Sequence, residues 1–286
     1  MGRSIAVLSQ KGGTGKTTAV RTLTDAFRRS GIRTLAIDLD PQGNLSDYFD
    51  HVPDVEPTIA DVLCGRSHPA EAIRRDLISA NLTLAEAELM LGGKMGRELA
   101  LRRALAEVSD DYELILIDCP PSLGLLTLNA LVAADRALIT AEAQYFALRG
   151  VEQAIDVVEL ARDGLNPDLS VLGVLLNLAD MRTVHSREAL ASLKERFHEL
   201  VFSTVVRASI AYAESAERTT SILDHRPDLG VDYLALADEV LERLPGLQDA
   251  RIVGGRSDRS GSAEAASALT TDPHSSLTSL PHVPEM

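Results

Sequence analysis

A glycine-rich segment, SQKGGTGKTT at 9–18, constrains the fold of this chain more than any other feature. It follows a short apolar run at 4–9 and precedes a helical pattern at 15–31. Glycines in such a turn let backbone N–H groups point at phosphate oxygens, and the helix start adds free N–H groups and the positive end of its dipole. The segment departs from the standard pattern G-x-x-x-x-G-K-[ST], because Gln10 stands at the first glycine position and an additional lysine, Lys11, precedes a glycine pair. The sequence therefore predicts a phosphate-binding loop of an unusual type.

The end of this loop supplies side chains that suit nucleotide chemistry. We predict that Lys16 reaches the β- and γ-phosphates of a bound nucleotide and that the Thr17 hydroxyl ligates Mg²⁺. Thr18 would help to hold the phosphates. The alternative is a glycine-rich turn that only caps a helix, but the order of apolar strand, GKTT and helix favours nucleotide binding.

Two acidic segments support this interpretation. Asp118 ends the apolar run ELILID, where an aspartate can hold the Mg²⁺ shell through water; the alternative is a strand-end aspartate that caps the next turn. In DLDPQGN, at 38–44, Asp40 is the better candidate to position or activate the water that attacks the γ-phosphate. We expect Asp38 to fix the loop or the metal shell. The candidate metal-binding residues are Thr17, Asp40 and Asp118.

Short apolar runs alternate with longer helical patterns along the chain. Runs that are apolar on both faces indicate a three-layer α/β fold, with a mostly parallel, twisted sheet covered by helices on both faces. Ligands of such sheets bind beyond the carboxyl ends of the strands, where the glycine loop, DLDPQGN and DCPPSLG are expected. Strands are predicted at 4–9, 33–40, 82–87, 112–119, 136–141, 169–177 and 199–206. Helices are predicted at 15–31, 58–65, 69–77, 93–108, 122–134, 149–163, 186–198, 211–222 and 230–244.

Charge and composition limit the class of protein. The 286 residues include 28 Lys and Arg against 42 Asp and Glu, a net charge of −14, so the chain is not an obvious nucleic-acid binder. Two cysteines, Cys64 and Cys119, do not make a disulfide framework in a chain of this length. Neither a signal peptide nor a long apolar run is recognised, so we expect a soluble, cytoplasmic protein with no membrane partner. We predict one domain at 1–247 and a disordered tail rich in Ser, Gly and Pro at 248–286.

Four segments together resemble the ParA family of ATPases, within the wider ParA/MinD group of deviant Walker-type NTPases. They are KGGTGKTT, DLDPQGN, ILIDCPPSLGLLTLNAL and AEAQYFALRGVEQ, in the family's order and spacing, and the resemblance covers about residues 3–244. It implies a P-loop NTPase of the deviant Walker A type that hydrolyses ATP to ADP and phosphate, with ATP and Mg²⁺ as cofactors. It also implies that Asp40 is the water-positioning residue.

The resemblance implies a role for the additional lysine. In the family, the lysine at the place of Lys11 crosses to the nucleotide of a second subunit, and two subunits sandwich two ATP molecules. A cation from the other chain then neutralises charge on the transferring phosphoryl group, as an arginine finger does. The implied homodimer forms only with ATP, which makes ATP an association switch. The catalytic candidates are Lys11, Lys16 and Asp40.

A polar residue, Asn177, ends the last well-defined apolar run. The resemblance favours a side-chain amide that contacts the adenine edge, and the alternative is an Asx-turn that starts a loop. The candidate nucleotide-binding residues are Lys11, Gly12, Gly13, Thr14, Gly15, Lys16, Thr17, Thr18 and Asn177.

The resemblance also implies partners. ParA proteins coat nonspecific DNA as the ATP dimer, and a ParB-like adaptor stimulates hydrolysis and release, which partitions plasmids or chromosomes. The ATP-bound form would therefore associate with the nucleoid. Arg182 matches a family arginine, but two others fall on Ala208 and Ala211, so Arg207 and Arg218 are candidates to supply charge from nearby. The alternative is that these arginines only solvate their helices.

Two alternative functions use the same ATPase cycle. One is the positioning of a protein cargo, such as a carboxysome or a chemoreceptor cluster, and nothing in the sequence excludes it. The other is a MinD-like, membrane-associated regulator of cell division. That function needs a C-terminal amphipathic helix, and the segment after residue 247 shows no amphipathic stripe.

Overall fold

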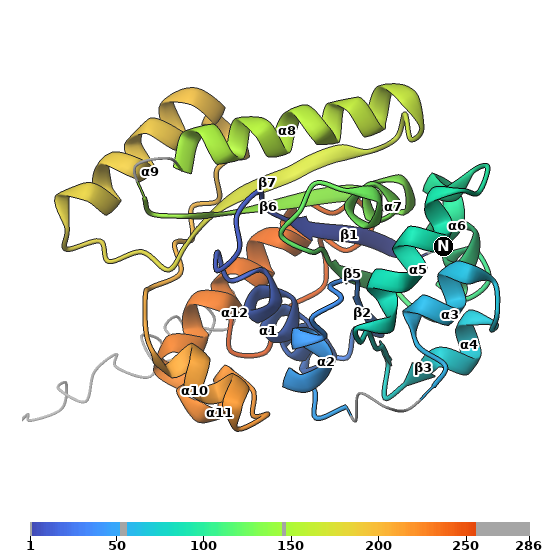
Figure 1. Cartoon of the computed structure of the whole chain (residues 1–286). Coiled ribbons are helices and arrows are strands. Elements are labelled where there is room, and N and C mark those ends of the chain that lie inside the picture. The colour runs from blue at the N-terminus through green and yellow to red at the C-terminus, as the bar shows by residue number, and fades with distance from the viewer. Residues whose placement is uncertain (1, 52–55, 145–146, 256–286) are drawn as a thin grey trace, which may run out of the picture.

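A seven-stranded sheet forms the centre of the computed structural model in Figure 1, which describes residues 2–51, 56–144 and 147–255. The strand order is β3-β4-β2-β5-β1-β6-β7, and every neighbouring pair is parallel except β3 with β4. The strands are β1 (Arg3–Leu8), β2 (Thr34–Asp38), β3 (Ile73–Arg74), β4 (Leu77–Ile78), β5 (Leu114–Asp118), β6 (Arg136–Glu142) and β7 (Ser170–Asn177). The predicted α/β fold is therefore confirmed.

Alternating side chains of β1 explain why helices cover both faces. Ala6 and Leu8 belong to the apolar cluster on one face of the sheet, and Ile5 and Val7 belong to the cluster on the other. All four are fully buried, as the uninterrupted apolar run requires.

The helices divide between these two clusters. Residues of α3 to α9 pack on one face, and residues of α1, α2 and α10 to α12 pack on the other (Figure 1). The helices are α1 (Lys16–Arg29), α2 (Asn44–Tyr48), α3 (Ile59–Cys64), α4 (Pro69–Ala72), α5 (Thr83–Gly92), α6 (Ala100–Leu105), α7 (Leu125–Ala133), α8 (Ala147–Gly164), α9 (Val184–Phe197), α10 (Ala211–Glu217), α11 (Ile222–His225) and α12 (Pro227–Glu242). Short 3₁₀ turns are η1 (Arg97–Leu99), η2 (Ser109–Asp111) and η3 (His198–Leu200). Among the described residues, no helix is both long and apolar enough to cross a membrane.

Two predicted strands are wrong. The segment 82–87 is mostly the first half of α5, whose buried residues Leu84, Ala87 and Leu91 follow helical spacing. The segment 199–206 forms the end of η3 and then one isolated bridge, at Val201, instead of a strand. The carboxylate of Glu239 on α12 accepts hydrogen bonds from two backbone N–H groups of this segment, those of Ser203 and Thr204, each at 2.8 Å. Those groups are therefore not available to a continuous strand ladder.

The packed part of the chain extends past the predicted domain boundary at 247. Ile252 is fully buried in the cluster that contains α1 and α12. The remainder of the predicted tail, 256–286, lies outside the described residues.

The strand order brings the polar segments of the sequence to one edge. Asp118 at the end of β5 pairs in register with Val7 of β1 on one side and with Asp38 of β2 on the other. The glycine loop, the segment DLDPQGN and the segment DCPPSLG therefore meet at the carboxyl ends of adjacent strands.

Candidate functional site

The loop between β1 and α1 has the conformation that its glycines allow. Gly13 and Gly15 have φ values of +80° and +78°, a region that other residues rarely adopt. A Cβ on Gly15 would lie 2.4 Å from the side-chain nitrogen of Asn177, so the position also needs the smallest residue. Helix α1 starts directly afterwards at Lys16, and its free N–H groups therefore face the loop.

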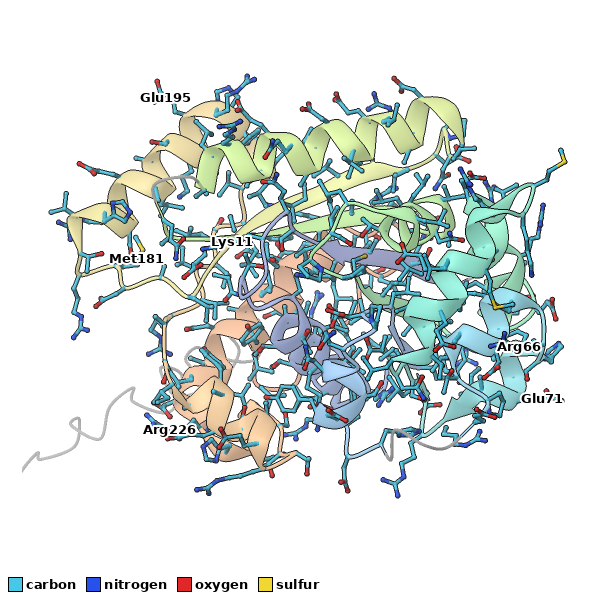
Figure 2. All side chains as sticks on the ribbon, viewed as in Figure 1. Lys11, Arg66, Glu71, Met181, Glu195 and Arg226 are labelled. Atoms are coloured by element: carbon cyan, nitrogen blue, oxygen red, sulfur yellow. The ribbon has the colours of Figure 1, made fainter. Side chains whose placement is uncertain are left out.

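The two lysines of the loop lie in different environments. Lys16 is only 6% exposed, and its Nζ donates to the Ser9 hydroxyl at 3.2 Å within the loop. The Lys11 side chain is 61% exposed and contacts Glu142 and Gln144 at the end of β6 and just beyond it. Figure 2 marks Lys11 on the loop that joins β1 to α1. One lysine is thus held inside the loop and the other lies at its surface.

Two of the three candidate metal-binding residues, Thr17 and Asp118, are in direct contact, and the metal-binding role of Asp40 stays a prediction. The Thr17 hydroxyl donates to Asp118 Oδ2 at 2.7 Å, and Asp118 is fully buried. The other oxygen, Asp118 Oδ1, has no hydrogen-bond partner among the described residues. Burial, reinforced by the carboxylate of Asp38, raises the pKa of Asp118 to about 8. A buried, unsatisfied carboxylate oxygen beside a threonine hydroxyl fits the oxygen ligands of an Mg²⁺ shell.

The loop after β2 is held by Asp38. Its Oδ2 accepts bonds from the backbone N–H and the hydroxyl of Ser46 at 2.9 and 2.8 Å, and its Oδ1 accepts from the Asp40 N–H at 3.0 Å. Burial raises the pKa of Asp38 to about 6. Asp38 therefore fixes the loop, as expected. Asp40, 8% exposed, accepts from the Gln42 N–H, and its action on a water stays a prediction.

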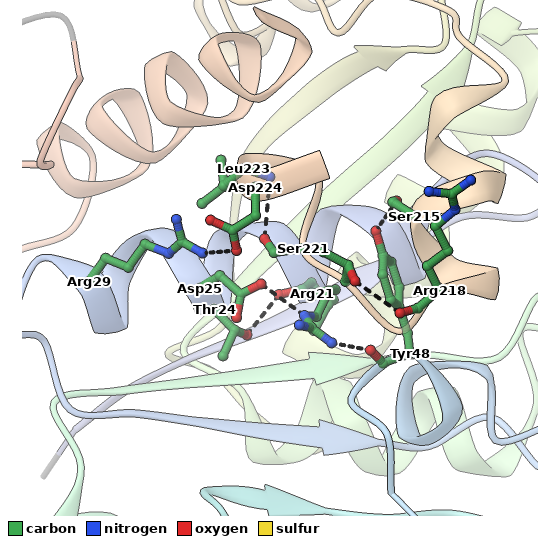
Figure 3. Close-up of polar contacts among 12 residues, drawn as sticks. Arg21, Thr24, Asp25, Arg29, Tyr48, Ser215, Arg218, Ser221, Leu223 and Asp224 are labelled. Carbon is green, nitrogen blue, oxygen red and sulfur yellow. Dashed lines mark hydrogen bonds and ion pairs between the residues drawn. The ribbon is translucent and has the colours of Figure 1, made fainter. Parts of the chain in front are cut away.

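Helix α2, which follows this loop, is tied to two other helices (Figure 3). The Tyr48 hydroxyl bonds the Ser215 hydroxyl of α10, and both groups are buried. Arg21 of α1 donates to the Tyr48 carbonyl and to Asp25, and its guanidinium stacks on the rings of Tyr48 and Phe49 at 4.9 and 4.1 Å. The segment that carries Asp40 is thus connected to both the loop helix and the C-terminal helices.

Asn177 contacts the glycine loop in this structure. It is fully buried, and its Nδ2 donates to the carbonyls of Thr14 at 2.9 Å and Gly15 at 3.4 Å. Its Oδ1 accepts from the Leu178 N–H. The predicted contact with adenine stays a prediction. Both N–H groups of the amide face loop carbonyls, so its Oδ1 is the atom left to accept a bond from an adenine amino group.

The three candidate DNA-binding arginines differ in their ion pairs. Arg182 makes two hydrogen bonds to Asp180, at 2.9 and 2.8 Å, and Arg207 donates to Asp232 at 2.7 Å. Arg218, at the end of α10, is exposed and has no ion-pair partner within the described part of the chain. The first two cations are therefore partly neutralised within the chain.

Sequence reasoning missed several residues of the site. Thr140 of β6 bonds the Thr14 hydroxyl at 2.9 Å, and Ser9 accepts a bond from Thr14 at the same distance. Glu142 and Gln144 lie in the segment AEAQYFALRGVEQ, which carried part of the family resemblance but had no role assigned. Their meeting with Lys11 depends on β6 lying beside β1, and spacing in the sequence does not reveal that pairing.

Comparisons with known proteins show which proteins this chain resembles. The model of a family described as AAA domain matches residues 2–171. The sporulation initiation inhibitor protein Soj of Bacillus subtilis is 38% identical over 84% of this chain and 98% of its own length. The chromosome partitioning protein ParA of Myxococcus xanthus is 36% identical over 85% of this chain and 89% of its own. A solved structure of cobyrinic acid a,c-diamide synthase from Mycobacterium smegmatis, with ADP and magnesium, is 36% identical with a TM-score of 0.76, covering 88% of this chain and 99% of that one.

Proposed function

Because this chain belongs to the ParA/MinD family of P-loop ATPases, we propose that it is an ATP-dependent association switch that partitions DNA. The chain is an ATPase with ATP and Mg²⁺ as cofactors. The proposed function adds three elements to that activity: an ATP-dependent homodimer, nonspecific DNA as the surface it binds, and a ParB-like adaptor that stimulates hydrolysis. The protein would act in the cytoplasm and associate with the nucleoid when ATP is bound.

The residues of the candidate site have different roles within one subunit. Lys16 and the N–H groups of residues 12–18 bind the phosphates, since the glycines expose that backbone. The hydroxyl of Thr17 and the carboxylate of Asp118 hold Mg²⁺, which when bound offsets negative charge on the phosphate oxygens. Asp40, placed by Asp38 at the edge of the site, orients the attacking water.

The exposed position of Lys11 is the observation that carries the association switch. A lysine needed only for its own nucleotide would gain from burial inside the loop, which is where Lys16 lies. The ammonium of Lys11 instead lies at the surface, so a second chain that docks on this edge can bring its own Lys11 to the nucleotide. Removing such a cation from an arginine-finger position costs about 10³- to 10⁵-fold in rate.

Binding to nonspecific duplex DNA tests the proposed function. It should be measured with ATP, with ADP and without nucleotide, over a salt series, with the Asp40→Ala variant used to hold the ATP state. We expect DNA binding in the presence of ATP but not with ADP or without nucleotide. The affinity should fall steeply with salt, because phosphate contacts release counterions. An ATP dimer that is confirmed by light scattering but does not bind DNA would contradict the partition function.

A parallel experiment tests cobyrinic acid as a substrate, since a relative is named cobyrinic acid a,c-diamide synthase. ATP turnover should be measured with cobyrinic acid and an ammonia donor in place of DNA. We expect no stimulation. Turnover that depends on cobyrinic acid would instead support an amide-forming reaction.

A further inference from the structure

The ammonium group of Lys11 is occupied within its own subunit. Its Nζ donates to Glu142 Oε2 at 3.3 Å and to Gln144 Oε1 at 2.5 Å. These residues also line a cavity of about 310 Å³ beside the glycine loop, together with Gln10, Thr140 and Gly150. Lys11 therefore closes one side of a cavity of its own chain.

The partners of Lys11 are attached firmly to the loop that carries it. Glu142 is the last residue of β6, and Thr140, two residues earlier on the same face of the strand, bonds Thr14 of the loop. Glu142 also pairs in register with Asn177, whose amide holds two loop carbonyls. Buried contacts thus fix the position of Glu142 relative to the loop, whereas the Lys11 side chain that meets it is 61% exposed.

Two contacts of Lys11 compete with each other. An ammonium group that donates to Glu142 and Gln144 has one N–H left, so a close contact with the phosphates of a second subunit competes with both residues. We propose that Glu142 and Gln144 are positioning residues that hold Lys11 on its own subunit, so that ATP-dependent association must first break this contact. The inference rests on the proposed function of Lys11 across the dimer, and it adds the two residues that set how readily the dimer forms.

The expected effect is moderate, because the Lys11 side chain is 61% exposed and that of Glu142 is 27% exposed. An ion pair of this exposure changes an equilibrium about 1.5- to 5-fold, and a two-fold dimer breaks two of them. Glu142→Gln should therefore tighten the ATP dimer about 2- to 25-fold. Gln144→Glu should act in the opposite direction, because it places a second carboxylate beside Lys11.

The first measurement examines the contact in the full chain without nucleotide. Lys11 is acetylated with N-hydroxysuccinimidyl acetate and followed by mass spectrometry, with Lys194 as the internal reference. Freed Lys11 should react faster relative to Lys194 in Glu142→Gln than in the wild type. Glu152→Gln is the matched control, because it removes the same charge from an exposed pair with Arg196, 3.0 Å long. An unchanged Lys11 rate in Glu142→Gln would overturn the inference.

The second measurement is the dimer dissociation constant with ATP, from sedimentation velocity in the Asp40→Ala background. The inference requires a tighter dimer for Glu142→Gln, a weaker one for Gln144→Glu and no change for Glu152→Gln. A wild-type dimer that Glu142→Gln leaves unchanged or weakens would overturn the inference but leave the association switch intact. Absence of any ATP dimer in the wild type would instead refute the association switch itself, and the inference with it.

Discussion

At the scale of single residues, the site depends on which partner each polar group has. Both carboxylate oxygens of Asp38 accept hydrogen bonds from the segment that follows it, whereas Asp118 keeps one buried oxygen without a partner among the described residues. Such an oxygen is costly to bury unless a ligand satisfies it. The difference separates a carboxylate that builds the loop from one suited to a cation.

Replacement of Asn177 distinguishes its two candidate roles. Asn177→Ala removes the bonds to the carbonyls of Thr14 and Gly15, so we expect weaker binding of ATP and GTP by a similar factor, roughly 5- to 10-fold for the loss of about one net hydrogen bond. A contact with adenine predicts a loss for ATP alone. Fluorescent nucleotide titration measures both.

Asn166→Ala is the matched control for this experiment. Asn166 is also buried, and its amide donates to two carbonyls, those of Leu131 and Ala134, near the amino ends of β6 and β7 and thus at the opposite end of these strands from the site. Its replacement should lower stability but leave the affinity for both nucleotides unchanged. An equal loss of affinity in the two variants would attribute the effect to general destabilisation.

At the scale of elements, short helix α2 depends on its neighbours for its position. Five residues are too few for a helix to be stable alone. At one end Ser46 donates to Asp38, and at the other end the Tyr48 hydroxyl bonds Ser215 and the Tyr48 carbonyl accepts a bond from Arg21. These bonds hold α2 against the sheet and α10. The segment after Asp40 is therefore ordered by tertiary contacts.

Variants of this cluster should lower the free energy of unfolding in a definite order. Tyr48→Phe removes one buried hydrogen bond and should cost about 1 kcal/mol. Arg21→Ala removes an ion pair, a bond to a carbonyl and two ring contacts, and should cost roughly 2–3 kcal/mol. Urea unfolding followed by circular dichroism measures both.

Tyr112→Phe provides the control, since its hydroxyl makes an exposed bond to Asp76. Its expected cost is within about 0.5 kcal/mol. If Tyr48→Phe costs no more than Tyr112→Phe, the bond to Ser215 contributes nothing to holding α2.

At the scale of the whole molecule, an acidic chain that binds DNA must do so through a local surface. The net charge is −14, and two of the three candidate arginines are paired with carboxylates. Asp180 holds its negative charge firmly, because the hydrogen bonds from Arg182 lower its pKa to about 2. A phosphate has to compete with this carboxylate for Arg182, whereas Arg218 has no such competitor in the described structure.

The arginines should therefore contribute unequally to DNA affinity. We expect Arg218→Ala to weaken ATP-dependent DNA binding more than Arg182→Ala and to lower the salt slope by about one per subunit. Fluorescence anisotropy with labelled duplex DNA over a salt series measures both quantities. Arg162→Ala, which removes an exposed arginine of α8, is the control. If the DNA-binding curve of Arg218→Ala overlays that of Arg162→Ala, the end of α10 is not part of the DNA-binding surface.

The sequence by itself determined the features that depend on neighbours along the chain. The glycine loop, the strands β1, β2 and β5 and the aspartates at their ends follow from local periodicity and from the conformations that glycine allows. Because parallel strands align their carboxyl ends, those local features were enough to predict one nucleotide site at one edge of the sheet.

Only the tertiary structure decided the partners of these groups. Lys11 contacts Glu142, which is 131 residues away in the sequence, and Asn177 contacts the glycine loop, which is 163 residues away. Glu239 accepts hydrogen bonds from N–H groups that a strand at 199–206 would have used. Periodicity reports whether a side chain is buried, but it does not report which distant group lies opposite. That choice is made when the strands pair and the helices pack, because buried hydrogen-bonding groups must then find partners wherever the fold places them.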